Sequence, residues 1–215
     1  MSNGVSNGVS NGVSDNFRKK QLFNKYQKQL ALFLTDGDIK TALNCGDDKI
    51  IKYSDLANYD CFCKLLPSNT FDFRVILIEQ KENVGHFVCI VRQNNNIYLF
   101  DPYGCPIDRE LSFIDKAQRI LLGEDKRLVE RLINKCNCEV NIYENNNQFQ
   151  SLKDGVSCCG RWCVLFIEMC RLGYDIDEFS KFIFTASENE NKPTDILVTD
   201  WIKVGSDFKE RDEPV

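Results

Sequence analysis

Three runs rich in β-branched and aromatic residues lie close together in the middle of the chain, and they constrain the fold more than any other feature. They span residues 73–80, 86–92 and 97–101. The stretches between them, KENVG and QNNN, are short and consist largely of turn-forming residues. Connections this short cannot carry a crossover, so we expect an antiparallel meander.

Helical periodicity surrounds these strands. Apolar residues recur at spacings of three and four within residues 17–34, and Thr35 is placed to cap the short helix IKTAL. Two more helices fit residues 108–122 and 124–135, and a strand fits roughly 139–143. This order of elements predicts the α+β class, with a central sheet, mainly antiparallel or mixed, flanked by helices.

The length of 215 residues suits a single domain with loose ends. Residues 1–16 contain a threefold Ser-Asn-Gly-Val repeat, a composition that resists ordering, so we expect a flexible leader. We expect the domain to span residues 17–205 and a charged tail to occupy 206–215. Neither a secretion signal nor an apolar run of about 20 residues is visible, so we expect a protein made in a cytosol, outside membranes.

The net charge and the cysteine content limit which ligands, metals and disulfides the chain is expected to have. A net charge of -5 argues against nucleic-acid binding through the whole surface. Eleven cysteines without a secretion signal predict mostly free thiols. The chain has a single histidine, which excludes a Cys2His2 zinc site. Another structural zinc site remains the minor alternative, because two C-x-C pairs are present, Cys61/Cys63 and Cys136/Cys138. We therefore expect no metal and no cofactor.

A reactive cysteine is suggested where a polar loop enters the apolar stretch CCGRWCVLFIEMCRLG. This stretch predicts a buried helix that begins near Cys159 and ends at Gly173. The positive end of a helix dipole stabilises a thiolate and lowers the pKa of its thiol. Gly160 would let a substrate carbonyl approach the backbone. Taken alone, Cys159 is better interpreted as a buried core cysteine.

Two further residues fit beside that thiol. The single histidine, His86, opens the second predicted strand, and Asp101 ends the third. In neighbouring antiparallel strands the start of one lies beside the end of the next, so Asp101 could fix the tautomer and orientation of the imidazole. Alone, each has a plain interpretation, a surface histidine and a turn residue before Pro102. Together with Cys159 they form a consistent nucleophile, base and carboxylate.

The motifs G-H-F, Y-L-F-D-P-Y-G, Q and C-G-x-x-C-x-x-F resemble the adenovirus maturation protease and its Ulp1-like relatives over roughly residues 70–172. The order His, Asp, Gln, Cys is also the order of that family. The resemblance implies an adenain/Ulp1-like cysteine protease fold with the nucleophile Cys159 at a helix N-terminus. It also implies that His86 is the general base and that Asp101 orients it.

The chain departs from the family pattern in three places. The oxyanion glutamine of the family lies six or seven residues before the cysteine, whereas Gln150 lies nine before it, which implies a longer loop, and Gln148 is the alternative. Phe87 replaces the usual tryptophan, which implies a wider substrate tunnel. Cys158 adjoins the nucleophile, but only Cys159 precedes glycine as in the family.

The resemblance implies a cysteine endopeptidase that cleaves viral capsid or scaffold precursors after small residues such as glycine during virion maturation. Its place would be the virion and the host cytoplasm, as for relatives in large DNA viruses and virophages. We expect a monomer whose partner is the protein substrate, with DNA as a conceivable activator through the basic stretch 18–28. The alternatives are a deubiquitinase or SUMO-type isopeptidase, an inactive protease-fold binding or packaging protein, and an acyltransferase.

Overall fold

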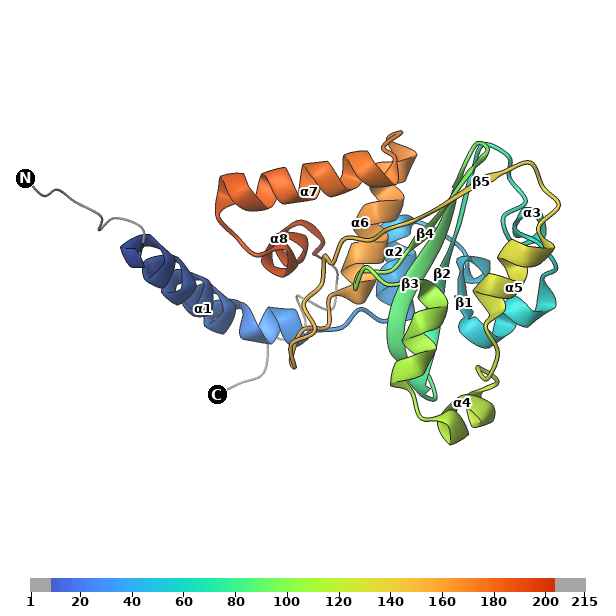
Figure 1. Ribbon diagram of the computed structural model, residues 1–215, viewed down its shortest axis with the longest axis horizontal. Helices are drawn as coiled ribbons and strands as arrows, with labels where there is room; N and C mark the ends of the chain where they lie inside the picture. The colour runs from blue at the N-terminus through green and yellow to red at the C-terminus, as the bar shows by residue number, and fades with distance from the viewer. Residues whose placement is uncertain (1–8, 204–215) are drawn as a thin grey trace, which may run out of the picture.

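The computed structural model describes residues 9–203 and contains one mixed sheet with strand order β1-β2-β3-β4-β5 (Figure 1). The three central strands pair antiparallel, which confirms the predicted meander. Each edge strand joins its neighbour in parallel, β1 beside β2 and β5 beside β4. The strands are β1 (Ile50–Lys52), β2 (Phe71–Lys81), β3 (Val84–Gln93), β4 (Asn96–Phe100) and β5 (Asn141–Glu144).

Helices cover both faces of the sheet, so the α+β class with a mixed, flanked sheet is confirmed. Alternate strand residues point to opposite faces. Phe87 and Phe100 join one buried cluster with α6, and Val88 and Leu99 join another with α5. The helices of the first face are α1 (Val9–Ala31), α2 (Asp36–Leu43), α6 (Cys159–Arg171), α7 (Ile176–Glu190) and α8 (Thr194–Trp201). Those of the second are η2 (Tyr53–Asn58), α3 (Phe62–Leu65), η3 (Ile107–Phe113) and α5 (Leu128–Lys135).

The ends of the chain depart from expectation in one respect. Helix α1 begins at Val9, inside the leader predicted for residues 1–16. Adding residues to an existing helix costs far less than nucleating one, so a polar repeat can continue a helix that its neighbours start. Residues 1–8 and the predicted tail, 206–215, lie outside the described residues.

The helix predicted over residues 108–122 is two elements. The 3-10 segment η3 ends at Phe113, and α4 (Lys116–Leu122) begins after Asp115. The Asp115 carboxylate accepts a hydrogen bond from the Ala117 N–H at 2.8 Å and so caps a new helix. A single apolar stripe in the sequence did not reveal this break.

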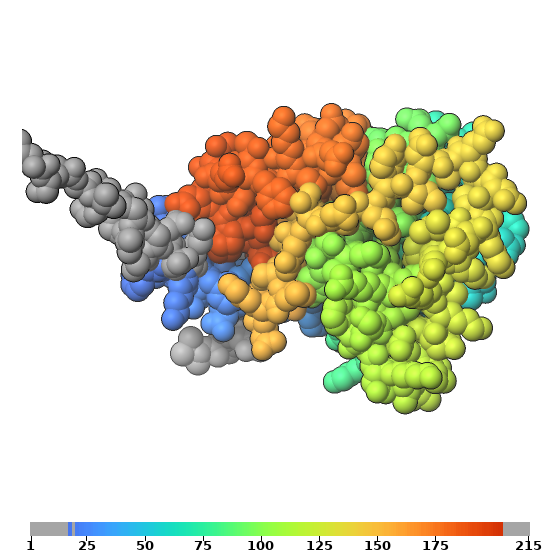
Figure 2. Space-filling view, in the orientation of Figure 1, coloured from blue at the N-terminus to red at the C-terminus, as the bar shows by residue number. Residues whose placement is uncertain are grey.

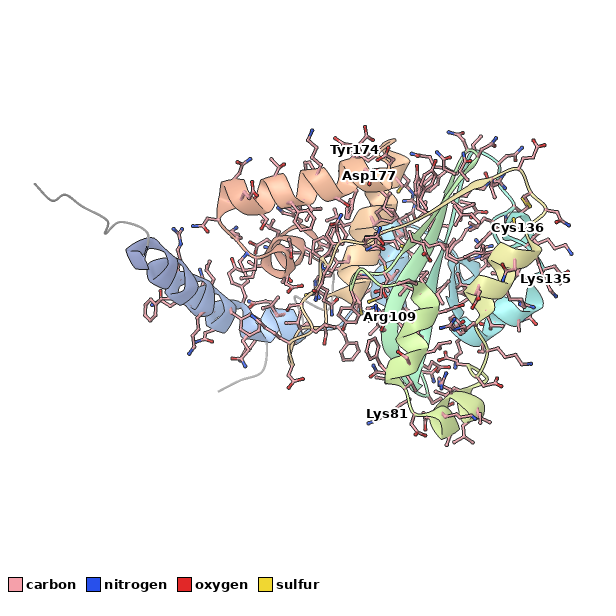
Figure 3. All side chains as sticks on the ribbon, viewed as in Figure 1. Lys81, Arg109, Lys135, Cys136, Tyr174 and Asp177 are labelled. Atoms are coloured by element: carbon pink, nitrogen blue, oxygen red, sulfur yellow. A yellow bond between two sulfur atoms is a disulfide. The ribbon has the colours of Figure 1, made fainter. Side chains whose placement is uncertain are left out.

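Nine of the eleven cysteines are free thiols, in line with the expectation of mostly free thiols, and the other two are paired. Cys63 in α3 and Cys138, just after α5, form a disulfide with Cα atoms 6.6 Å apart. Figure 3 labels Cys136 at the end of α5, away from α6. The sequence could not predict this pairing because 75 positions separate the two residues.

Candidate active site

The single histidine is fixed by the glycine before it. A Cβ on Gly85 would lie 1.8 Å from the Ile78 carbonyl oxygen, so only glycine lets β2 and β3 approach so closely. His86 follows, opposite Ile78 in the strand pair, and is only 5% exposed. The imidazole is therefore mounted rigidly at the beginning of β3.

Asp101 lies where β4 ends, and hydrogen bonds fix its backbone and one of its two carboxylate oxygens. Its backbone N–H donates to Asn145 Oδ1 at 2.8 Å, and Asn145 Nδ2 donates back to its carbonyl at 2.7 Å. Carboxylate oxygen Oδ1 accepts from the Tyr103 N–H at 2.9 Å and lies 2.8 Å from His86 Nε2. The predicted Asp101–His86 pair is thus present, fully buried, and held by the turn that follows β4.

The structure places Cys159 at the first turn of α6, against the same imidazole. Its sulfur forms a hydrogen bond with His86 and accepts hydrogen bonds from the backbone N–H groups of Phe87 and Gly160. Because Nε2 of His86 faces Asp101, Nδ1 is the ring nitrogen left for the sulfur. The three residues singled out in the sequence therefore form one hydrogen-bonded chain.

The pKa shifts of Cys159 and His86 favour an ion pair between these two side chains. Burial acts to raise the pKa of Cys159, but the hydrogen bond and charge of His86 outweigh it, and the pKa of the thiol is lowered. Burial acts to lower the pKa of His86, but hydrogen bonds to Asp101 and Cys159 outweigh it, and the pKa of the imidazole is raised well above its usual value. Both shifts favour a thiolate beside an imidazolium.

The neighbouring Cys158 faces the other way. Its sulfur lies 3.5 Å from Thr199 Oγ1 and 3.9 Å from the Leu30 carbonyl oxygen, inside the helical core. Burial raises the pKa of Cys158 to about 12. Of the two adjacent cysteines, Cys159 is the one that reaches His86.

Gln150 is connected to the imidazole of His86 through the side chain of Tyr103. Tyr103 stacks on the His86 ring with centroids 4.3 Å apart, and Gln150 Nε2 donates to the Tyr103 hydroxyl at 3.2 Å. The Gln150 N–H donates to the Pro102 carbonyl at 2.9 Å, which fixes the loop. Gln148 is exposed, and its amide caps the Gln150 carbonyl. Of the two candidate glutamines, Gln150 is therefore the one beside Cys159 and His86.

A cleft of about 890 Å³ opens onto the thiol. Cys159, His86, Phe87 and Gln150 lie in its walls, together with the loop 33–37. In Figure 2 the segment between β5 and α6 crosses the visible face between the helical half of the molecule and the sheet half. A second cleft of about 960 Å³, between that segment and α7 and α8, shares Gln150 but is not lined by the thiol or the imidazole.

Gly160 also has a packing role, which the sequence did not indicate. A Cβ there would lie 3.1 Å from Leu34 and 3.3 Å from Ile39, so the missing side chain lets the segment around α2 pack against α6. Glycine is needed here for packing between elements. Its N–H contributes to the site by donating to the Cys159 sulfur.

Sequence reasoning missed two residues of this site, Tyr103 and Glu110. Tyr103 stands in the Asp-Pro-Tyr-Gly turn, and its nearness to Asp101 was a usable signal. Glu110 left no signal, because a charged residue in a predicted helix is normally exposed. Among the described residues, His86, Asp101 and Glu110 are the single group of three whose ligand-type atoms lie within 4.8 Å of one another, close enough to contact one metal ion.

Comparison with known proteins finds a relative encoded by a virophage. No protein-family profile matches it. It is 30% identical over 176 residues to the "Uncharacterized protein V9" of Sputnik virophage, a match that covers 81% of this chain and 95% of V9. The chain belongs to the V9 family. Among residues 9–203, none of the helices of this V9 relative combines the length and apolar character needed to cross a bilayer.

Proposed function

We propose that this protein is a cysteine endopeptidase with Cys159 as nucleophile, His86 as general base and Asp101 as the group that orients the base. The observation that carries the proposal is the buried chain of hydrogen bonds from the Cys159 sulfur through the imidazole to Asp101, where Nε2 and Oδ1 are 2.8 Å apart. Such a chain is what a thiol needs to attack an amide at neutral pH.

In the first step the Cys159 thiolate attacks the carbonyl carbon of the scissile peptide. A C–S bond forms, and the carbonyl oxygen becomes an oxyanion. The Cys159 N–H and the Gln150 amide are the proposed donors to that oxygen, and in known enzymes one such donor contributes about 3–4 kcal/mol. The C–N bond then breaks, and the imidazolium of His86 gives its proton to the leaving amine.

The second step releases the other product. Water attacks the thioester carbonyl while neutral His86 takes a proton from that water. The C–S bond breaks, the acid product leaves, and the thiolate–imidazolium pair is restored. In the present structure Gln150 Nε2 donates to Tyr103 and to the Val156 carbonyl, so an oxyanion would replace one of these acceptors.

The proposed substrates are viral capsid or scaffold precursors, cut after small residues such as glycine, in the virion and the host cytoplasm. The virophage relative supports a role in a viral life cycle. The adenain-like motifs around Asp101 and Cys159 support maturation proteolysis within it. The cleft of about 890 Å³ that opens onto Cys159 is large enough for several residues of an extended chain.

A second part of the proposal concerns activation by DNA. Arg18, Lys20, Lys25 and Lys28 are exposed on α1, so a basic helix is available to phosphates. Adding duplex DNA at low salt should then raise the rate of cleavage. Equal rates with and without DNA would remove DNA from the account and leave the endopeptidase proposal intact.

The test is to co-express the active chain, or its Cys159→Ala variant, with the structural proteins of a virophage particle. Mass spectrometry should find new protein termini after small residues only with the active chain. If no new termini form while ubiquitin-like fluorogenic amides are hydrolysed, the protein is an isopeptidase. If neither is cleaved and product forms only with acetyl-CoA, it is an acyltransferase, and if nothing reacts it is a binding protein.

A further inference from the structure

A fourth ionisable side chain lies behind the proposed triad. Glu110 comes from η3, which packs on the sheet through Ile107 and Leu111, and it is only 6% exposed. Its carboxyl lies beside that of Asp101, and ligand-type atoms of Glu110, Asp101 and His86 all lie within 4.8 Å of one another. The cluster of ionisable side chains therefore continues one residue past Asp101.

Two buried carboxyl oxygens in this cluster lack a donor. Asp101 Oδ1 already has the imidazole and the Tyr103 N–H. Asp101 Oδ2 and Glu110 Oε1 have no N–H or O–H group of any described residue directed at them. Ionised carboxylates only accept hydrogen bonds, so two of them cannot satisfy each other. One proton shared between Glu110 and Asp101 satisfies both.

The charges around Glu110 favour the same arrangement. The groups that face it are Asp101, His86, Tyr103, Cys105 and Arg109. Arg109, labelled in Figure 3 on η3, is exposed and therefore screened by solvent. Burial, and then the charge of Asp101, raise the pKa of Glu110 to about 7.

We propose that Glu110 is a positioning residue: in its protonated form it donates a hydrogen bond to Asp101 and so fixes the carboxylate that holds His86 against Cys159. This rests on the proposed function only in taking Cys159 as the nucleophile. Below pH 7 the donor is present. As the pH rises through about 7 the proton leaves, the donor is lost, and two buried carboxylates repel each other.

The experiment measures the alkylation rate of Cys159 by iodoacetamide between about pH 5.5 and pH 8.5, a range centred on neutral titrations. Peptide mapping assigns the label to Cys159. Glu110→Gln keeps a donor to Asp101 but cannot titrate, and Glu110→Ala removes the donor. Glu124→Gln is the matched control, because Glu124 is buried, has a pKa raised to about 7 by burial, and accepts its hydrogen bond from the Glu79 N–H instead.

The wild-type rate should fall by about threefold or more as the pH passes 7, whereas the Glu110→Gln rate should stay level. The lowered pKa of the thiol and the raised pKa of the imidazole both widen the pH range of the ion pair. An inflection that Glu110→Gln removes therefore belongs to Glu110, whereas one that persists in Glu110→Gln belongs to the ion pair. Glu110→Ala should be slower than Glu110→Gln at pH 6, and Glu124→Gln should follow the wild type.

A Glu110→Gln profile that superimposes on the wild type would overturn the proposal, and so would an identical change in Glu124→Gln. Circular dichroism on each variant checks the fold. Alkylation needs no protein substrate, so the result stands even if the protein cleaves nothing. Conversely, a failed prediction at Glu110 leaves the tests of proteolysis untouched.

Discussion

The first two turns of α6 each carry a buried cysteine, but the pKa values of the two thiols shift in opposite directions. Cys159 and Cys163 are both buried on one helix, four residues apart. Burial raises the pKa of Cys163 well above its usual value, and its hydrogen bond is to another thiol, Cys89. At Cys159 burial acts in the same direction, but His86 and two backbone N–H groups outweigh it.

The comparison separates burial from activation. A buried thiol without a cationic or N–H partner remains a small apolar side chain. The same thiol becomes a nucleophile when the fold places an imidazole and unpaired N–H groups beside it. We therefore expect the partners at the start of α6 to decide which cysteine of this chain reacts.

The largest expected effect separates the two cysteines directly. Cys159→Ala should reduce substrate cleavage by at least about 10³-fold, because the attacking atom is gone. Cys163→Ala should lower stability by about 1 kcal/mol through lost packing but keep most of the activity. Cleavage kinetics with thermal unfolding of both variants makes the check, and activity surviving in Cys159→Ala would reject the assignment.

A second change tests oxyanion stabilisation separately from thiol activation. Gln150→Ala should lower kcat by about 10²–10³-fold, the range for one oxyanion donor, with the alkylation rate of Cys159 nearly unchanged. Gln148→Ala is the control and should behave as the wild type, since Gln148 is exposed. Equal losses in both variants would mean that the loop, rather than the Gln150 amide, matters.

A third change should make Cys159 resemble Cys163. His86→Gln removes the cationic partner, so the pKa of Cys159 should rise and its alkylation at pH 6 should slow by about 10–100-fold. The sign follows from the lowered pKa of the native thiol, whose thiolate persists at low pH only while His86 stays protonated. Alkylation rates measured from low to high pH make the check, and an unchanged profile would show that the imidazole does not activate the sulfur.

The smallest effect on reactivity is expected at the disulfide. Replacing Cys63 and Cys138 by serine opens a link across 75 positions and should lower the free energy of unfolding by about 2–4 kcal/mol. Cys159 should be alkylated at the wild-type rate, because the link joins α3 to the end of α5. Denaturant unfolding and alkylation of the same samples test both halves, and a large change in alkylation would couple two regions that we treat as independent.

The sequence predicted what depends on local pattern. The strands that carry His86 and Asp101 and the helix that begins at Cys159 follow from periodicity and turn residues. The pairing of neighbouring antiparallel strands then brought His86 and Asp101 together. The imidazole–sulfur contact, which no local pattern fixes, was an expectation from the resemblance, and the geometry agrees with it.

Other features depend on long-range packing and could not be predicted. Strand β1 is three residues long, which is too short to show the alternation of apolar and polar residues typical of a strand. Its conformation is fixed by pairing with β2. The sequence around Glu110 predicts a solvent-exposed charge, and its burial results from the packing of η3 on the sheet. The disulfide needs α3 and the end of α5 to meet, which only the complete fold brings about.

The most direct test of the account is a competition among the cysteines of the wild-type chain. A limiting amount of iodoacetamide at pH 6, followed by peptide mapping, ranks the free thiols by reactivity. We predict that Cys159 is labelled first although it is only 7% exposed, ahead of the half-buried Cys45 and Cys105, whose pKa values are raised by burial. Labelling of Cys45 and Cys105 with Cys159 left unmodified would contradict the central claim that His86 activates this sulfur.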